Sequence, residues 1–176
     1  MAGRSEKRKI DTALGGVMAA GSLAVLWLAC VVPSGRIGLT AAAGLFPMAA
    51  TLYAGRTAGY LCWAAASLLG LFMLPDKGVA LLFLAFLGLY PVVKGRIETL
   101  DRRAVEWGLK LCWFELTLTL FWFVFQELFL PQAPEWLADN ALLLYILGGL
   151  VFVCYDIGLS QLITLLRTRL YRAKGH

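Results

Sequence analysis

Charged residues are scarce in this sequence. Only 15% of its 176 residues are Asp, Glu, Lys or Arg, against roughly a quarter in soluble domains, while 60% are hydrophobic and the mean hydropathy is +0.75. A soluble domain of this length cannot bury so much apolar surface. The composition therefore predicts an integral membrane protein.

Metal-binding and nucleotide-binding patterns are also lacking. The only histidine is His176, and the four cysteines lie singly within apolar runs. This distribution lacks the usual ligands of zinc and haem and contains no disulfide framework. No glycine-rich phosphate loop is present. We therefore expect no metal, no cofactor and no enzymatic activity of the chain itself, so any nucleotide hydrolysis would come from another chain.

What the sequence has instead is six long apolar runs. A transmembrane helix needs about 20 predominantly apolar residues, and short connections separate these runs. The prediction is an all-α polytopic membrane bundle in one domain, with spans at 12–32, 37–53, 57–74, 79–93, 105–130 and 141–166. The second to fourth spans are short, and Pro47 predicts a kink in the second.

Basic residues occur in alternate connections. Of the 16 Lys and Arg residues, only Arg36 and Lys77 lie in the loops that follow the first and third spans. The positive-inside rule then places both termini in the cytoplasm. The net charge of +5 is attributed to this topology and to anionic lipid, with no nucleic-acid partner. Residues 94–110 are predicted to form a cytoplasmic amphipathic connection.

Two acidic residues lie deep in the predicted spans. Glu115 and Asp156 occupy the fifth and sixth spans, and an ionisable residue at membrane depth costs about 2.5–3.5 kcal/mol on insertion scales. Because these spans are antiparallel, the two carboxyls could meet at one level. One alternative is helix packing, with the acids neutral or paired to Lys94, Lys110 or Arg56. The other is a polar path for a solute or a proton.

Helical spacing gives each acid a polar or small-residue stripe. The stripes are Glu115, Thr119, Trp122 and Gln126 in the fifth span, and Tyr145, Gly149, Asp156 and Ser160 in the sixth.

Charged, amide and aromatic residues gather near the predicted outer mouth, as in a small-molecule pocket. The candidate substrate-binding residues are Arg36, Trp122, Gln126, Glu127 and Tyr145. An aromatic belt at the membrane interface is the alternative explanation for the Trp and Tyr residues.

Small residues recur along the first span. Gly16, Ala20 and Ala24 are spaced by four residues, which permits close helix packing. The neighbouring helix could belong to this chain or to another subunit.

Several local patterns resemble one membrane-protein family. They are the small residues from Ala13-Leu14 through Ala19-Ala20 and Ala24, then Leu45-Phe46-Pro47, and a Gly55-Arg56-Thr57-Ala58-Gly59 turn. With six predicted spans, the chain resembles the substrate-binding S components of energy-coupling-factor vitamin transporters. It departs from them at Arg56, where proline is usual, and in its short loop at 33–36.

The resemblance implies a subunit that binds a vitamin or similar micronutrient from the outer side. Gly16, Ala20 and Ala24 would contact a transmembrane coupling subunit, and two cytoplasmic ATPases would drive uptake. One alternative is a non-transport scaffold of a cell-envelope complex, which would use its helix faces and residues 94–110. Another is a stand-alone proton-coupled carrier that uses Glu115 and Asp156.

Overall fold

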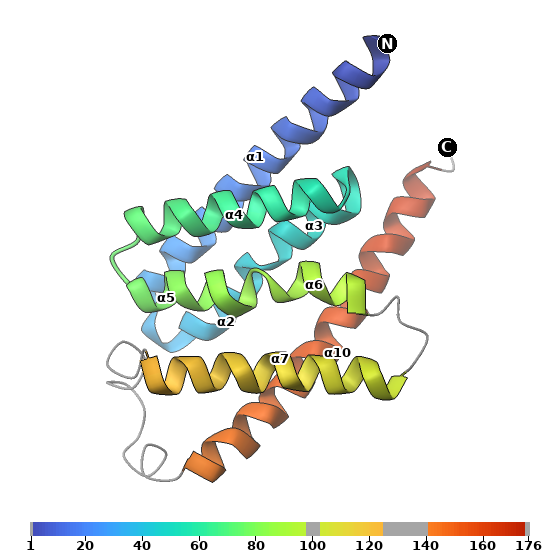
Figure 1. Ribbon diagram of the computed structural model, residues 1–176. Helices are drawn as coiled ribbons and strands as arrows, with labels where there is room; N and C mark the ends of the chain where they lie inside the picture. Colours follow the sequence, from blue (N-terminus) through green and yellow to red (C-terminus); the bar gives the residue numbers. More distant parts are fainter. Residues whose placement is uncertain (1, 98–102, 125–140, 175–176) are drawn as a thin grey trace. The chain divides into compact units, whose positions relative to one another are not determined.

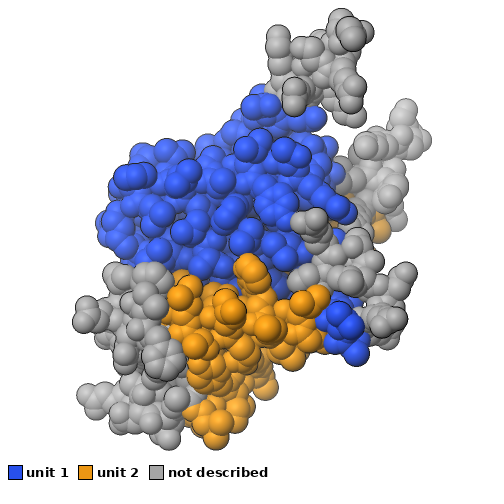
Figure 2. Space-filling view, in the orientation of Figure 1, with its two compact units in different colours: residues 1–106 blue, residues 107–176 orange. Residues whose placement is uncertain are grey.

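Helices make up every regular element that the structure describes. The structure is a computed structural model and describes residues 2–97, 103–124 and 141–174 (Figure 1). By contacts the chain divides into two units, residues 1–106 and 107–176 (Figure 2). The predicted all-α class is confirmed.

The first unit is a series of helices joined by very short connections. Its elements are α1 (Ala2–Val31), the 3₁₀ turn η1 (Pro33–Gly35), α2 (Arg36–Ala43), α3 (Leu45–Ala54), α4 (Arg56–Met73), α5 (Lys77–Leu82), the π-helical turn η2 (Phe83–Leu87) and α6 (Tyr90–Ile97). Helix α7 (Arg103–Val124) begins at the end of this unit, and α10 (Ala141–Lys174) completes the second.

Proline and glycine set the helix ends in the first unit. Helix α1 ends just before Val32, and Leu74 after α4 is extended; each precedes a proline, which disfavours helical backbone in the preceding residue. Gly55 separates α3 from α4 with a φ of 89°, a conformation that glycine adopts without a steric penalty. These positions turn one apolar segment back against the next.

Four segments are long and apolar enough to cross a membrane. They are Asp11–Val31, Arg36–Ala54, Lys77–Gly95 and Tyr145–Leu166. They coincide closely with the first, second, fourth and sixth predicted spans. The third and fifth predictions fall on helices α4 and α7, the latter described only to Val124, so the count of six spans and their orientation stay predictions.

Two of these segments are interrupted helices. The second breaks at Gly44, three residues before Pro47, which therefore lies in the first turn of α3. A proline is tolerated there because its missing N–H needs no intrahelical partner. The other widens into η2, where the Gly88 N–H bonds the Phe83 carbonyl at 2.8 Å. The irregularity predicted for the short spans is thus a helix break at Gly44 in one segment and the π-helical turn η2 in the other.

Small side chains build the core of the first unit. Helix α1 packs against α2, α3 and α4, and α3 packs along α4. A methyl group on Gly59 would overlap the Thr51 side chain, so α3 and α4 approach closely only because this residue is glycine. The buried apolar cluster comprises Ala19, Leu26, Ala29, Ala43, Ala50, Cys62, Ala66, Leu74, Val79, Ala80 and Phe83.

The segment predicted as an amphipathic connection is shared between two helices. Residues 94–97 end α6, and residues 103–110 begin α7. The side chains of Lys94 and Lys110 are buried, at 0% and 2% exposure. Each end therefore continues a longer helix, and because residues 98–102 lie outside the described part, the amphipathic connection stays a prediction.

Candidate functional site: a polar helical hairpin

Helices α7 and α10 form an antiparallel pair fixed by a ladder of contacts. The Phe114 and Phe152 rings stack with centroids 4.7 Å apart. One turn further along α7, Gly148 faces Leu118 and also contacts Phe114, at 3.4 Å and 3.1 Å from the position of a Cβ. Four residues forward on α7 therefore correspond to four residues backward on α10. The lack of a side chain at Gly148 lets the aromatic pair sit between the helices.

A buried ion pair forms one rung of this ladder. The Lys110 Nζ lies 3.2 Å from the Asp156 Oδ2, and the two side chains are only 2% and 3% exposed. The Lys110 ammonium also lies 5.4 Å from the centre of the Trp107 ring, within cation–π range. Opposite charges in apolar surroundings avoid much of the cost of burying either one alone.

The ion pair agrees with one of the sequence-based alternatives for Asp156. Pairing to a lysine was the packing interpretation, and Lys110 was one of the three expected basic partners. One turn later on α10, Ser160 donates its hydroxyl to the backbone carbonyl of Asp156 at 2.9 Å. The pair fixes how α7 and α10 meet.

A second polar rung joins the predicted stripes. The Thr119 and Tyr145 hydroxyls are 2.8 Å apart and share a hydrogen bond. Thr119 belongs to the predicted stripe of the fifth span and Tyr145 to that of the sixth. The two stripes therefore meet, as their spacing suggested, at this position.

Glu115 does not meet Asp156 at one level. The ladder pairs Asp156 with Lys110, and Glu115 lies five residues further along α7, about 7.5 Å at 1.5 Å per residue. Helical spacing alone gives the face of each residue but leaves the axial offset of the two helices undetermined. Glu115 is partly exposed, so it remains reachable from outside the pair.

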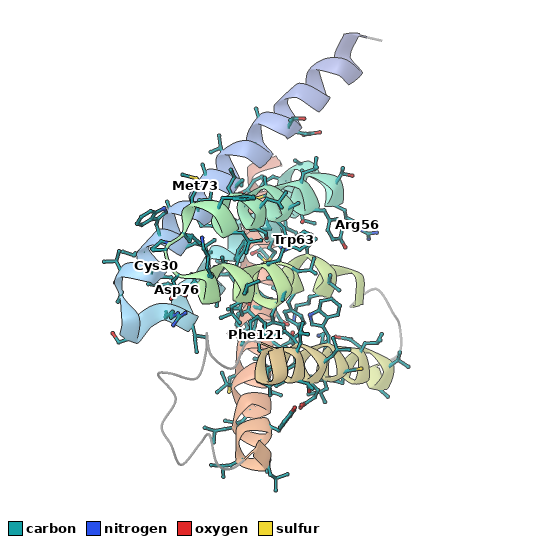
Figure 3. The ribbon with its side chains drawn as sticks, turned by 60° about the vertical axis from the view of Figure 1, so that its left-hand side comes forward. Cys30, Arg56, Trp63, Met73, Asp76 and Phe121 are labelled. Atoms are coloured by element: carbon teal, nitrogen blue, oxygen red, sulfur yellow. The ribbon has the colours of Figure 1, made fainter. Side chains whose placement is uncertain are left out.

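Arg36 belongs to a different cluster, in the first unit. Its guanidinium forms an ion pair with Asp76. The same carboxylate caps α5, accepting hydrogen bonds from the backbone N–H groups of Gly78 and Val79 at 2.9 Å and 3.3 Å. Asp76, labelled in Figure 3, thus ties the start of α2 to the start of α5. Lys77 donates to the carbonyls of Leu71 and Leu74 at the end of α4.

The other predicted substrate-binding residues are only partly described. Tyr145 bonds Thr119 in the second unit. Trp122 lies in α7, but its side chain is outside the described part, as are Gln126 and Glu127 entirely. That these residues lie close to Arg36 therefore remains a prediction.

The π-helical turn carries a polar contact that sequence reasoning missed. The Trp63 indole N–H, labelled in Figure 3, donates to the Leu84 carbonyl at 3.1 Å. A methyl group on Gly44 would overlap the Leu87 carbonyl. Helix α4 and the break between α2 and α3 therefore both contact η2. A π-helical turn, with its five-residue hydrogen-bond spacing, produces no recognisable pattern of apolar residues in the sequence. The only local indication of the turn is Gly88, which follows it.

The small residues of α1 fall on two faces. Gly15, Ala19 and Ser22 are buried, and Ser22 donates to the Ala43 carbonyl at 3.0 Å. The predicted subunit-contact residues Gly16, Ala20 and Ala24 are exposed. A Cβ placed on Gly16 would have no neighbour within 4 Å. Packing of this exposed stripe within the described part of the chain is therefore not observed.

Comparison of the chain with protein-family models, with curated proteins and with solved structures finds no match.

Proposed function

We propose that this chain is the substrate-binding membrane subunit of an ATP-driven micronutrient uptake system. It lies in a bacterial inner membrane with both termini in the cytoplasm and takes its solute from the outer side. A transmembrane coupling subunit and cytoplasmic ATPases are its partners. The proposal joins the sequence resemblance to one feature of the first unit.

That feature is the difference between the exposed face of α1 and the other exposed faces. Along α4 the exposed residues include Leu61, Leu68 and Phe72, at 58%, 57% and 84% exposure. Along α10 they are again mainly Leu, Ile and Val. The exposed face of α1 has Gly16, Ala20 and Ala24 in successive turns, although Val17 and the residues near its end, among them Leu28 and Val31, are large and exposed. Large aliphatic side chains suit lipid tails, whereas small ones let another helix approach.

A face of small side chains favours helix association in a bilayer because it lets a second helix approach closely. Lipid tails are as apolar as leucine, so helices in a membrane gain little from the hydrophobic effect when they associate. Backbone proximity and dense van der Waals contact replace it. The stripe supports docking of a transmembrane helix of the coupling subunit along α1.

The polar hairpin supports the solute-binding part of the proposal. Helices α7 and α10 place hydroxyl and carboxyl groups within an otherwise apolar pair of helices. Ligand sites in membrane and soluble proteins combine apolar walls with few polar groups. Arg36 and Tyr145 are the described members of the proposed binding set.

Substitution on the stripe tests the proposal. The double variant Gly16→Leu with Ala20→Leu fills the face with bulky side chains and should abolish co-purification of the coupling subunit from native membranes in mild detergent. Ala65→Leu is the matched control, because Ala65 is an exposed alanine on α4. An intact complex with the double variant would refute docking at this face.

The scaffold alternative predicts another outcome of the same experiment. Cell-envelope proteins would co-purify in place of ATPases, and no small molecule would be retained. The carrier alternative requires a coupling acid that takes up and releases protons, and the pairing of Asp156 with Lys110 leaves Glu115 for that role.

A further inference from the structure

One charged side chain inside the helical hairpin has no partner among the described residues. Residues 107–124 and 141–166 contain three charged side chains, Lys110, Glu115 and Asp156. Lys110 and Asp156 form an ion pair. Glu115 makes no hydrogen bond or ion pair with any residue in the described ranges. The Glu115 carboxylate is therefore available to a positively charged ligand.

Polar groups and free space lie at the level of that charge. Glu115 is one turn from Thr119 on α7, and Gly149 is one turn from Tyr145 on α10, so each pair shares a helix face. The hydrogen bond between the Thr119 and Tyr145 hydroxyls sets these two pairs at matching levels. A Cβ placed on Gly149 would meet nothing within 4 Å.

We propose that Glu115, Thr119 and Tyr145 form the binding site for an organic cation, with Gly149 providing room beside them. This inference rests on the proposed function and names the class of solute: a molecule with an ammonium or comparable positive group. The neighbouring Lys110–Asp156 pair is already satisfied and supplies no net attraction for an anion.

A carboxylate without a counter-ion within a predicted membrane span is costly even when it is partly exposed. A positive ligand offsets that cost and forms a charge-assisted contact. The hydroxyl oxygens of Thr119 and Tyr145 can accept hydrogen bonds from an ammonium group. The aromatic ring of Tyr145 offers a face to a quaternary cation. Partial exposure of Glu115 leaves the site accessible.

The test is direct binding to the purified full-length chain in detergent. Benzylammonium is the probe, and benzyl alcohol and benzoate are its neutral and anionic counterparts, measured by isothermal titration calorimetry. We expect saturable binding of benzylammonium alone. Glu115→Gln should weaken it by about tenfold or more, the range for loss of a charged hydrogen-bond partner. Glu115→Asp keeps the charge and should retain part of the affinity.

Two controls separate binding from folding. Glu106→Gln makes the same chemical change on the same helix and should leave binding unchanged. Thermal unfolding of each variant shows that the protein remains folded. Absence of saturable benzylammonium binding to the unmodified chain, or equal affinity in Glu115→Gln, would overturn the proposal.

This outcome is distinguishable from failure of the proposed function. Binding is measured on the isolated chain and needs no coupling subunit. Recovery of the ATPases without cation binding would leave the uptake proposal standing and remove the cationic solute. Cation binding without any ATPase partner would support the cationic solute and refute the uptake proposal.

Discussion

Lys110 and Asp156 form a buried ion pair in the described part of the second unit. Both side chains are almost fully buried, so removing one partner deprives the other buried charge of its described counter-ion. A buried pair gives little net stability relative to apolar residues of similar size, but losing one member is costly. The pair therefore fixes the register of α7 and α10 more than it stabilises the fold.

Single and double substitutions should differ sharply at this pair. Asp156→Leu alone should destabilise the protein by about 3–5 kcal/mol, because Lys110 loses its counter-ion. Lys110→Met combined with Asp156→Leu should recover most of that loss. Thermal unfolding in detergent of the two single variants and the double variant measures the coupling. A double variant as unstable as the sum of the single variants would contradict this role.

The sequence indicates which residues of the hairpin are important, but it does not determine at which level of the partner helix each of them lies. Asp156 stood out because a charge in an apolar run is costly, and Lys110 was one of its expected partners. Its level relative to Glu115 was not predictable, because helical periodicity fixes a face but not an axial offset. The Lys110–Asp156 pair, the stack of Phe114 on Phe152 and the space at Gly148 together set that offset.

At the scale of elements, the two interrupted segments, Arg36–Ala54 and Lys77–Gly95, contact one another through backbone. Gly44 abuts the Leu87 carbonyl in η2, and α2 and η2 are in contact. The short length of the second span and Pro47 within it predicted an irregular helix there. The π-turn was not predictable, since it depends on this tertiary contact and on the Trp63 hydrogen bond to Leu84.

Glycine-to-alanine substitutions test this close contact. Gly44→Ala should destabilise the protein by about 1–3 kcal/mol, the usual cost of overpacking, because the methyl group overlaps the Leu87 carbonyl. Gly38→Ala in α2 is the matched control, since a Cβ there meets nothing within 4 Å. The control should be neutral or slightly stabilising through helix propensity. Equal thermal stability of the two variants would contradict the observed contact.

At the scale of the whole molecule, hydropathy was the most reliable guide. Long apolar runs yielded four segments able to cross a membrane at nearly the predicted positions, because a span needs only length and apolarity. The third predicted span contains no charged residue, whereas the fifth contains Glu106, Lys110, Glu115 and Glu127. Neither α4 nor α7 is among the four segments, so their crossing stays a prediction. The orientation depends on where the basic residues lie in the sequence.

Single reporter cysteines test that orientation. Ser34 in η1 and Thr57 at the start of α4 are both exposed. In a background whose native cysteines are replaced, Ser34→Cys should react with a membrane-impermeant maleimide added to intact cells or to right-side-out vesicles. Thr57→Cys should react only after permeabilisation, because its loop is predicted to be cytoplasmic. Labelling in the opposite pattern would invert the topology.

We propose that this chain binds a solute for an ATP-driven uptake complex. Affinity purification of the tagged protein from its native membrane in mild detergent, with mass spectrometry of the co-purifying proteins and small molecules, tests this proposal. We expect a transmembrane coupling subunit, two ATPases and a bound positively charged metabolite. Recovery of cell-envelope assembly proteins with no bound small molecule would contradict the proposal.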